Sequence, residues 1–286
     1  MLNRSQSDLT NRRGNNAFPF DRDASKERCL RYRRKILDIS QKVPALHIAP
    51  AFSCVEIVDA VYHGLMRRNE DGEFGDSFLM SKGHGCMIQY VILAELGVLS
   101  QNDLDMYCKP GGRLGAHPDY GVPGVLAATG SLGHGMGMAV GMTYADRVAD
   151  LDRNTYVVLS DGEMQEGSSW EAMMMAANLG VNNLIAILDL NDFQGLGQTS
   201  ITHPAFYPVN QKVAAFGWEV AEIDGHDAAA LVTAIAERRG EKPMFIIART
   251  VKGRGVSYME NEPIWHYRSP NKAEYEQALR ELSEQQ

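Results

Sequence analysis

Three short runs of almost entirely apolar residues constrain the fold of this chain more than any other feature. They read YVVLS at 156–160, LIAILDL at 184–190 and MFIIART at 244–250, and a fourth strand-like run, GWEVAEID, lies at 217–224. Helix-like segments separate them, SSWEAMMMAANLG after the first run and DAAALVTAIAERRG before the last. Short apolar strands that alternate with helices are typical of a parallel sheet covered on both faces. The sequence therefore predicts an α/β fold with a mostly parallel sheet and helices on both faces.

The other segments add helices and one more strand. Helices are expected at 25–43, 53–66, 86–99 and 269–285, and a short strand is expected within 75–85. Ser53 and Glu56 have the spacing of a capping box, which predicts that Ser53 is a helix N-cap. Ser168 and Glu171 predict the same for the helix that follows the first apolar run, and Gly180 is expected to end that helix.

One domain accounts for most of the chain. No repeat or linker demands a second domain, so residues 23–286 are interpreted as a single unit preceded by a flexible polar arm over residues 1–22. Within the domain, residues 108–135 are rich in glycine and proline and lack periodicity. A loop of that length inside a compact domain is usually functional.

Charge and composition exclude several classes of protein. The 28 Lys and Arg against 36 Asp and Glu give a formal net charge of −8, which argues against nucleic acid as the main partner. Neither a long apolar stretch nor an apolar leader is present, so we expect no membrane span and no secretory signal. The four cysteines lack zinc-site spacing and are interpreted as reduced thiols of a cytoplasmic protein.

Two of the strand-like runs end in oxygen-bearing side chains. Asp161 follows the first run and Asn191 follows the second, with one helix between them. Parallel strands present their carboxyl ends at one edge, where open α/β sheets bind ligands. One carboxylate and one amide suit Mg²⁺, which completes its coordination with water and phosphates. Each residue alone is commonly a turn or cap residue; the pair favours a site for Mg²⁺ and a diphosphate.

Five landmarks in a fixed order resemble one family. They are SKGHG at 81–85, GAHPD at 115–119, ATGSLGHG at 128–135, DGEMQEGSSWEA at 161–172 and VKGRG with WHYRSPNK at 251–272. Together with the asparagine thirty positions after Asp161, they resemble the N-terminal, thiamine-diphosphate-binding half of transketolase. The resemblance covers residues 25–280. It implies that the cofactors are thiamine diphosphate and Mg²⁺, and that the cofactor supplies a ylid that stabilises a carbanion.

The resemblance also implies roles for individual residues. It assigns Mg²⁺ to Asp161, Asn191 and the main-chain carbonyl of Phe193. The residues that it implies for cofactor binding are Gly130, Ser131, Leu132, Gly162, Glu163, Glu166, His84 and His266, with Glu166 near a subunit contact.

Four histidines are the implied catalytic residues. The resemblance places His84 and His266 near the diphosphate and the substrate, and His47 and His117 beside the hydroxyls of the sugar. Histidine suits this chemistry because cleaving a C–C bond next to a hydroxyl requires a proton transfer near neutral pH. His117 could also be a simple turn residue. The remaining histidines at 63, 203 and 226 match no landmark and are interpreted as structural or surface residues.

The sequence departs from the family pattern at three positions and in length. Ser160 replaces the first glycine of the usual Gly-Asp-Gly, LHIAP at 46–50 lacks the usual glycines around His47, and His134 stands where the family has glutamine. The pyrimidine-binding half of transketolase, with the glutamate that activates the cofactor, is missing. We therefore expect one subunit of a split transketolase that acts on sugar or sugar-phosphate substrates, is inactive alone, and assembles with a C-terminal partner subunit into a heterotetramer.

Other functions remain open at this stage. The chain could belong to another thiamine-diphosphate enzyme, of the 2-oxo-acid dehydrogenase or deoxyxylulose-phosphate synthase type, or be a non-catalytic scaffold subunit. The glycine-rich GHGMGMAVG at 133–141 suggests a nicotinamide dehydrogenase, but no strand leads directly into it. A helix with such glycines more simply packs closely on a neighbour. Met173, Met174 and Met175 are interpreted as core or subunit contact.

Overall fold

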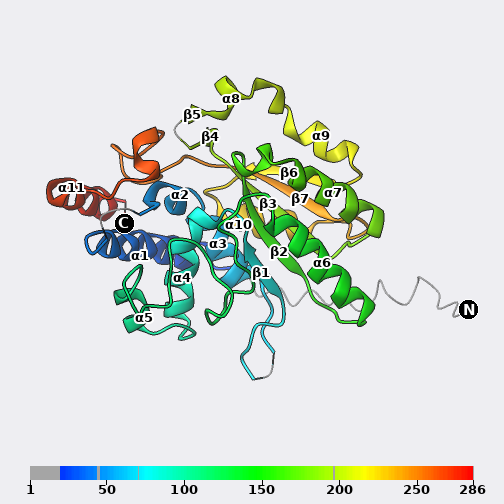
Figure 1. Cartoon of the computed structure of the whole chain (residues 1–286), viewed down its shortest axis with the longest axis horizontal. Coiled ribbons are helices and arrows are strands. Elements are labelled where there is room, and N and C mark those ends of the chain that lie inside the picture. The colour runs from blue at the N-terminus through cyan, green and yellow to red at the C-terminus, as the bar shows by residue number, and fades with distance from the viewer. Residues whose placement is uncertain (1–19, 44–45, 70, 196, 286) are drawn as a thin grey trace, which may run out of the picture.

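The computed structural model describes residues 20–43, 46–69, 71–195 and 197–285. Its centre is a five-stranded parallel sheet in the order β1-β2-β3-β7-β6 (Figure 1). These strands are β1 Ser77–Met80, β2 Thr155–Ser160, β3 Leu184–Leu190, β6 Glu219–Asp224 and β7 Met244–Arg249. All five coincide with strands expected from the sequence, and the predicted α/β class is confirmed. A small antiparallel pair, β4 Phe193–Gln194 and β5 Gly197–Gln198, follows β3.

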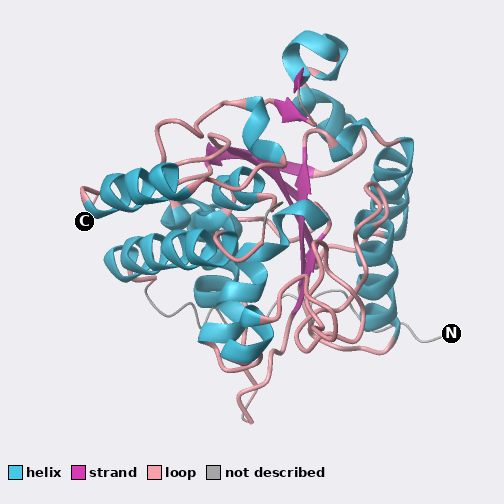
Figure 2. Cartoon of the chain, turned by 60° about the vertical axis from the view of Figure 1, so that its left-hand side comes forward, coloured by secondary structure: helices cyan, strands magenta, loops and turns pink. Residues whose placement is uncertain are grey.

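Helices lie on both sides of the sheet, as Figure 2 shows. They are α1 Arg22–Ser40, α2 Ile48–Ser53, α3 Val55–Ala60, α4 Cys86–Glu95, α5 Gln101–Asp105, α6 Gly135–Val148, α7 Gly167–Leu179, α8 Thr199–Thr202, α9 Val209–Ala215, α10 Ala228–Ala236 and α11 Lys272–Ser283. A π-helical turn, Val61–Leu65, extends α3. None of the helices in these ranges is long and apolar enough to cross a membrane.

Each face of the sheet has its own hydrophobic core. Tyr156 and Val158 of β2 pack with α1 to α4, α10 and α11, whereas Val157 and Leu159 of the same strand pack with α6, α7 and α9. Alternate residues of a strand point to opposite faces, so a strand buried on both faces is apolar throughout. This explains why the apolar runs were so clear in the sequence.

Two of the predicted helix starts are wrong. Ser53 is the last residue of α2, and its Oγ donates to Asp189 Oδ1 at 2.7 Å instead of capping a helix. Ser168 lies inside α7, which begins at Gly167, and its Oγ donates to the carbonyl of Gly133 at 2.9 Å. In both cases a partner distant in sequence takes the hydroxyl. Gly180 does end α7, with a left-handed φ of 61°.

The N-terminal boundary is also shifted. Residues 1–19 of the arm expected over 1–22 lie outside the described residues. Asp21 already caps α1 by accepting from the main-chain N–H groups of Asp23 and Ala24. Residues 106–134 contain no helix or strand, which agrees with the functional loop expected there.

Gly83 allows the turn after β1 to contact this loop. A Cβ added at Gly83 would lie 2.3 Å from the carbonyl oxygen of Thr129. Main-chain atoms cannot rotate away, so Gly83→Ala should displace the 128–135 segment and destabilise the fold by about 1–3 kcal/mol. Gly137→Ala is the matched control, because its Cβ would meet nothing within 4 Å. The control should be neutral or stabilising by up to about 1 kcal/mol. Denaturant unfolding of both variants measures the difference; equal stabilities would contradict the close contact.

Candidate active site

Asp161 and Asn191 lie at the same edge of the sheet. β2 and β3 pair directly, with Ser160 opposite Asp189, and both residues follow the carboxyl ends of these strands. Asp161 Oδ1 accepts from the N–H of Gly162 at 3.0 Å. Asn191 Oδ1 accepts from the N–H of Phe193 at 3.0 Å. The structure thus brings the three predicted metal ligands to two adjacent strand ends.

The donor set fits a hard cation. Asp161 is fully buried, and burial together with the nearby Asp189 raises the pKa of its carboxyl from 3.8 to about 7. A buried carboxylate of this kind gains from a cation that neutralises it. The described residues contain no cluster of three His, Cys, Asp or Glu side chains that could hold a metal. A cation would therefore use amide and carbonyl oxygens and a bound anion, as Mg²⁺ does.

Replacing the Asp161 carboxylate by an amide separates its cost from its use. The raised pKa means that Asp161 favours folding below pH 4 and that this contribution is lost as pH rises through about 7. Each pKa unit is worth about 1.4 kcal/mol. Asp161→Asn should therefore raise the Tm of the metal-free chain at pH 8, by about 2–4 °C per kcal/mol, and abolish stabilisation by Mg²⁺ with thiamine diphosphate. Thermal unfolding with and without these ligands checks both effects. Exposed Asp119→Asn is the control, and retained ligand stabilisation in Asp161→Asn would refute the metal assignment.

Glu163 joins the turn after Asp161 to the glycine-rich loop. Its Oε1 accepts from Ser81 Oγ at 2.5 Å and from the N–H of Gly133 at 3.0 Å. Its Oε2 is buried without a hydrogen-bond partner among the described residues, and burial raises the pKa of this carboxyl to about 7. The contact holds the segment with Gly130, Ser131 and Leu132 next to the turn. Direct contact of these residues with a cofactor stays a prediction.

Gly162 and Glu166 flank this turn. A Cβ at Gly162 would lie 3.0 Å from Gln194 Cβ, so the glycine permits the close approach of the segment after Asn191. Glu166 is exposed at the N-cap position of α7. Its predicted place at a subunit contact stays a prediction.

The four predicted histidines form one cluster, and His47 is its centre. The His47 ring centroid lies 6.1 Å from that of His84, 5.5 Å from His117 and 5.4 Å from His266. His84 and His266 are themselves 5.3 Å apart. Four segments separated in sequence converge here, because the start of α2, the turn after β1, the 106–134 loop and the turn Pro263–His266 each carry one of the rings. The replacement of glycines around His47 does not remove it from the cluster.

The histidines are held in their neutral forms. Burial lowers the pKa of His47 to about 4, with a smaller effect of His117, and lowers that of His266 to about 3, with a further effect of Lys252. The pKa values of His84 and His117 are lowered too, mainly by burial. Each neutral ring offers one donor and one acceptor nitrogen. A bound anion would favour their protonation, so the cluster is suited to hold hydroxyls and to exchange protons once an anionic ligand is present.

Lys252 was not singled out from the sequence, although it lies in the landmark VKGRG. It is 1 % exposed, and its Nζ lies 2.9 Å from His266 Nδ1. An ammonium can only donate, so Nδ1 accepts and the neutral ring carries its proton on Nε2. His226, interpreted as structural, supports the same segment: its Nε2 accepts from the N–H of Val251 at 2.8 Å, and its Nδ1 lies 3.1 Å from Glu56 Oε2.

Removing the ammonium tests this assignment. In Lys252→Met, His266 should become a mixture of its two tautomers, since nothing then requires Nδ1 to accept. The ¹⁵N chemical shifts of His266 in the full chain at neutral pH report the tautomer. The control is Lys212→Met, a lysine that caps main-chain carbonyls elsewhere. An unchanged Nε2–H form in Lys252→Met would show that Lys252 does not select it.

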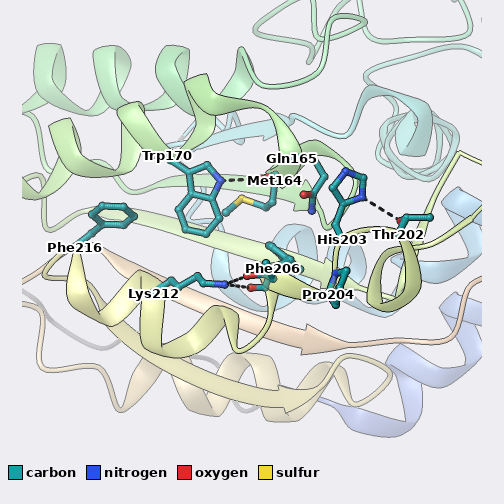
Figure 3. Close-up of a pocket in the computed structure, with 10 residues that line it drawn as sticks. Met164, Gln165, Trp170, Thr202, His203, Pro204, Phe206, Lys212 and Phe216 are labelled. Atoms are coloured by element: carbon teal, nitrogen blue, oxygen red, sulfur yellow. Dashed lines mark hydrogen bonds between the residues drawn. The ribbon is translucent and has the colours of Figure 1, made fainter.

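A separate cavity lies behind the turn after Asp161. It measures about 670 Å³ and none of the four clustered histidines lines it. Figure 3 shows Trp170 and Phe216 on one side and His203 near Gln165 on the other. Gln165 donates to the carbonyl of Asp161 at 3.1 Å, which is the link between this cavity and the metal-binding turn.

The glycine-rich helix and the methionines are placed as follows. No strand precedes α6 directly, and Gly137 and Gly141 face open space, so the close packing expected of them is not made by the described residues. Met173 is buried in the core, whereas Met174 and Met175 are exposed. His134 is exposed at the N-cap of α6, away from the histidine cluster.

This combination of sheet edge, oxygen ligands and histidines defines a thiamine-diphosphate-binding domain, and comparison with known proteins identifies its family. The family described as "Transketolase, thiamine diphosphate binding domain" matches residues 25–282. The chain belongs to the transketolase family and corresponds to its N-terminal, diphosphate-binding part.

Individual relatives indicate a split enzyme. The chain is 37% identical to one of the named subunits of the apulose-4-phosphate transketolase of Phocaeicola vulgatus over 257 residues, covering 88% of this chain and 91% of the relative. It is 34% identical to the 6-deoxy-6-sulfo-D-fructose transketolase subunit SqwG of a Clostridium species, covering 88% and 94%. Transketolase of Campylobacter jejuni superposes with a TM-score of 0.85 at 26% identity, covering 92% of this chain but 43% of that one. The chain therefore matches these subunits over nearly their whole length, as expected from its sequence, and spans less than half of that longer transketolase.

Proposed function

We propose that the chain binds Mg²⁺ and the diphosphate of thiamine diphosphate and, with a C-terminal partner subunit, transfers a two-carbon ketol unit between sugar or sugar-phosphate substrates. The observation that carries this proposal is the convergence of Asp161 and Asn191 at one sheet edge in a chain that matches transketolase subunits almost end to end. We further propose a cytoplasmic enzyme that assembles as a heterotetramer and has no activity as a single chain.

Each part of the site has a distinct task in this proposal. Asp161, Asn191 and the carbonyl of Phe193 hold the cation, which binds the diphosphate. The bound cofactor supplies the carbanion-stabilising centre. His266 donates from Nε2 because Lys252 occupies Nδ1. His47 and His117 orient the donor hydroxyls and accept the proton released when the C–C bond breaks.

The names of two relatives suggest which donors to test. Apulose 4-phosphate and 6-deoxy-6-sulfofructose are both ketoses with an anionic group at the end distant from the ketol unit. Within the described residues near the histidine cluster, Lys82 is paired with Asp189 and Arg268 with Glu274. We propose that the partner subunit supplies the cation that recognises this anionic end.

The assembled enzyme provides the test. The chain, co-purified with its native partner, should transfer ketol units from ketose phosphates only with Mg²⁺ and thiamine diphosphate, and the chain alone should be inactive. His84→Ala should assemble normally and lower kcat by about 100-fold or more, as for the loss of an acid–base group. Exposed His203→Ala is the control. Ketol transfer by the chain without a partner would overturn the split-subunit proposal.

The same assay separates the alternatives. Decarboxylation of pyruvate or another 2-oxo acid, without ketol transfer, would indicate the dehydrogenase or deoxyxylulose-phosphate synthase type. A complex that binds no cofactor would indicate a scaffold role.

A further inference from the structure

Tyr267 lies against the histidine cluster and has no role in what is described above. Its ring centroid is 4.4 Å from that of His266, at an interplanar angle of 59°, and 5.3 Å from that of His47, at 64°. Both neighbours belong to the predicted catalytic set. Tyr267 is therefore a fifth ring of the same cluster.

Tyr267 occupies the solvent side of this cluster. It is 54% exposed, whereas His266, the preceding residue, is 7% exposed. A substrate enters from solvent with its reacting carbons toward the buried histidines, so its distal carbons remain at the exposed end. Tyr267 is the aromatic residue at that end.

The Tyr267 side chain is not used to hold the fold together. Its hydroxyl makes no hydrogen bond within the described ranges, whereas those of Tyr90, Tyr258 and Tyr275 donate to main-chain carbonyls or a carboxylate. A tyrosine with one face on a histidine, the other toward solvent and a free hydroxyl is available to a ligand.

The segment that carries Tyr267 is nevertheless fixed. Arg268 pairs with Glu274 through both carboxylate oxygens, at 2.6 and 2.7 Å, and lies over the Trp265 ring at 4.5 Å. Ser269 Oγ donates to the carbonyl of Val43 at 2.9 Å. A ring presented on a fixed segment loses little conformational entropy when a ligand binds.

We propose that Tyr267 is a specificity-determining residue that packs its ring against the C–H face of the distal carbons of a ketose donor. Polyhydroxylated carbon chains expose C–H groups between their hydroxyls, and an aromatic face contacts these groups while the histidines bind hydroxyls at the reacting end. The inference rests on the proposed function, and it adds that the chain itself discriminates donors by the length of carbon chain beyond the ketol unit.

Two donors of different length test the proposal in the assembled enzyme. A five- or six-carbon ketose phosphate reaches Tyr267, whereas hydroxypyruvate carries the ketol unit with only a carboxylate and does not. Tyr267→Ala should raise KM for the ketose about 3- to 10-fold, as expected for loss of an aromatic contact, and leave KM for hydroxypyruvate and kcat for both donors unchanged. Tyr267→Phe should retain the wild-type KM, because it keeps the ring. Tyr120→Ala, at a tyrosine 80% exposed elsewhere, is the control.

Each other outcome has a defined meaning. Equal loss with both donors, or no loss with either, would overturn the specificity role. Loss of co-purification in Tyr267→Ala would instead make Tyr267 a contact of the partner subunit and also overturn it. Failure of the wild-type complex to use either donor would count against the proposed function itself, so the two failures are distinguishable.

Discussion

The buried ion pair between Lys82 and Asp189 is the interaction on which the site depends. Asp189 is a fully buried residue of β3, and it accepts from Lys82 after β1, from Ser53 of α2 and from Thr250 after β7. Two charges out of water are costly unless paired and hydrogen-bonded, and breaking such a pair typically costs about 3–5 kcal/mol. The pair and its hydrogen bonds thus fix three elements of the carboxyl edge relative to the central strand.

The positions of the ligands follow from this arrangement. Asn191 Nδ2 donates to Ser53 Oγ at 2.9 Å, so the hydroxyl bound to Asp189 also orients the amide oxygen toward the metal side. Asp161, on the adjacent strand end, has a raised pKa partly because of the negative charge of Asp189. One buried carboxylate therefore both positions the predicted metal site and increases its need for a cation.

The sequence predicted most of the fold because the sheet is buried on both faces. Apolar strands such as Leu184–Leu190 produce a continuous signal that local propensity does not obscure. The strand ends followed from topology alone, so Asp161 and Asn191 could be paired in advance. The four histidines were found through landmarks of a family, and their convergence required the structure.

What the sequence missed depends on contacts distant along the chain. Ser53 and Ser168 have the spacing of N-caps, but tertiary partners take their hydroxyls, and a tertiary contact overrides a local pattern. Lys252 and Tyr267 lie in or beside a recognised landmark. Their relevance became visible only through the burial of one and the exposure of the other, neither of which is encoded in local spacing.

The link made by Glu163 has a mechanical consequence. One carboxyl group connects the turn that follows the metal-binding aspartate to Gly133 and to Ser81, so these three loops behave as a single rigid body. A displacement of any one of them is transmitted to the other two without an intervening hinge. Occupancy at the metal end can therefore be sensed at the glycine-rich loop, and this chain can communicate the state of its half of the site to whatever surface contacts that loop.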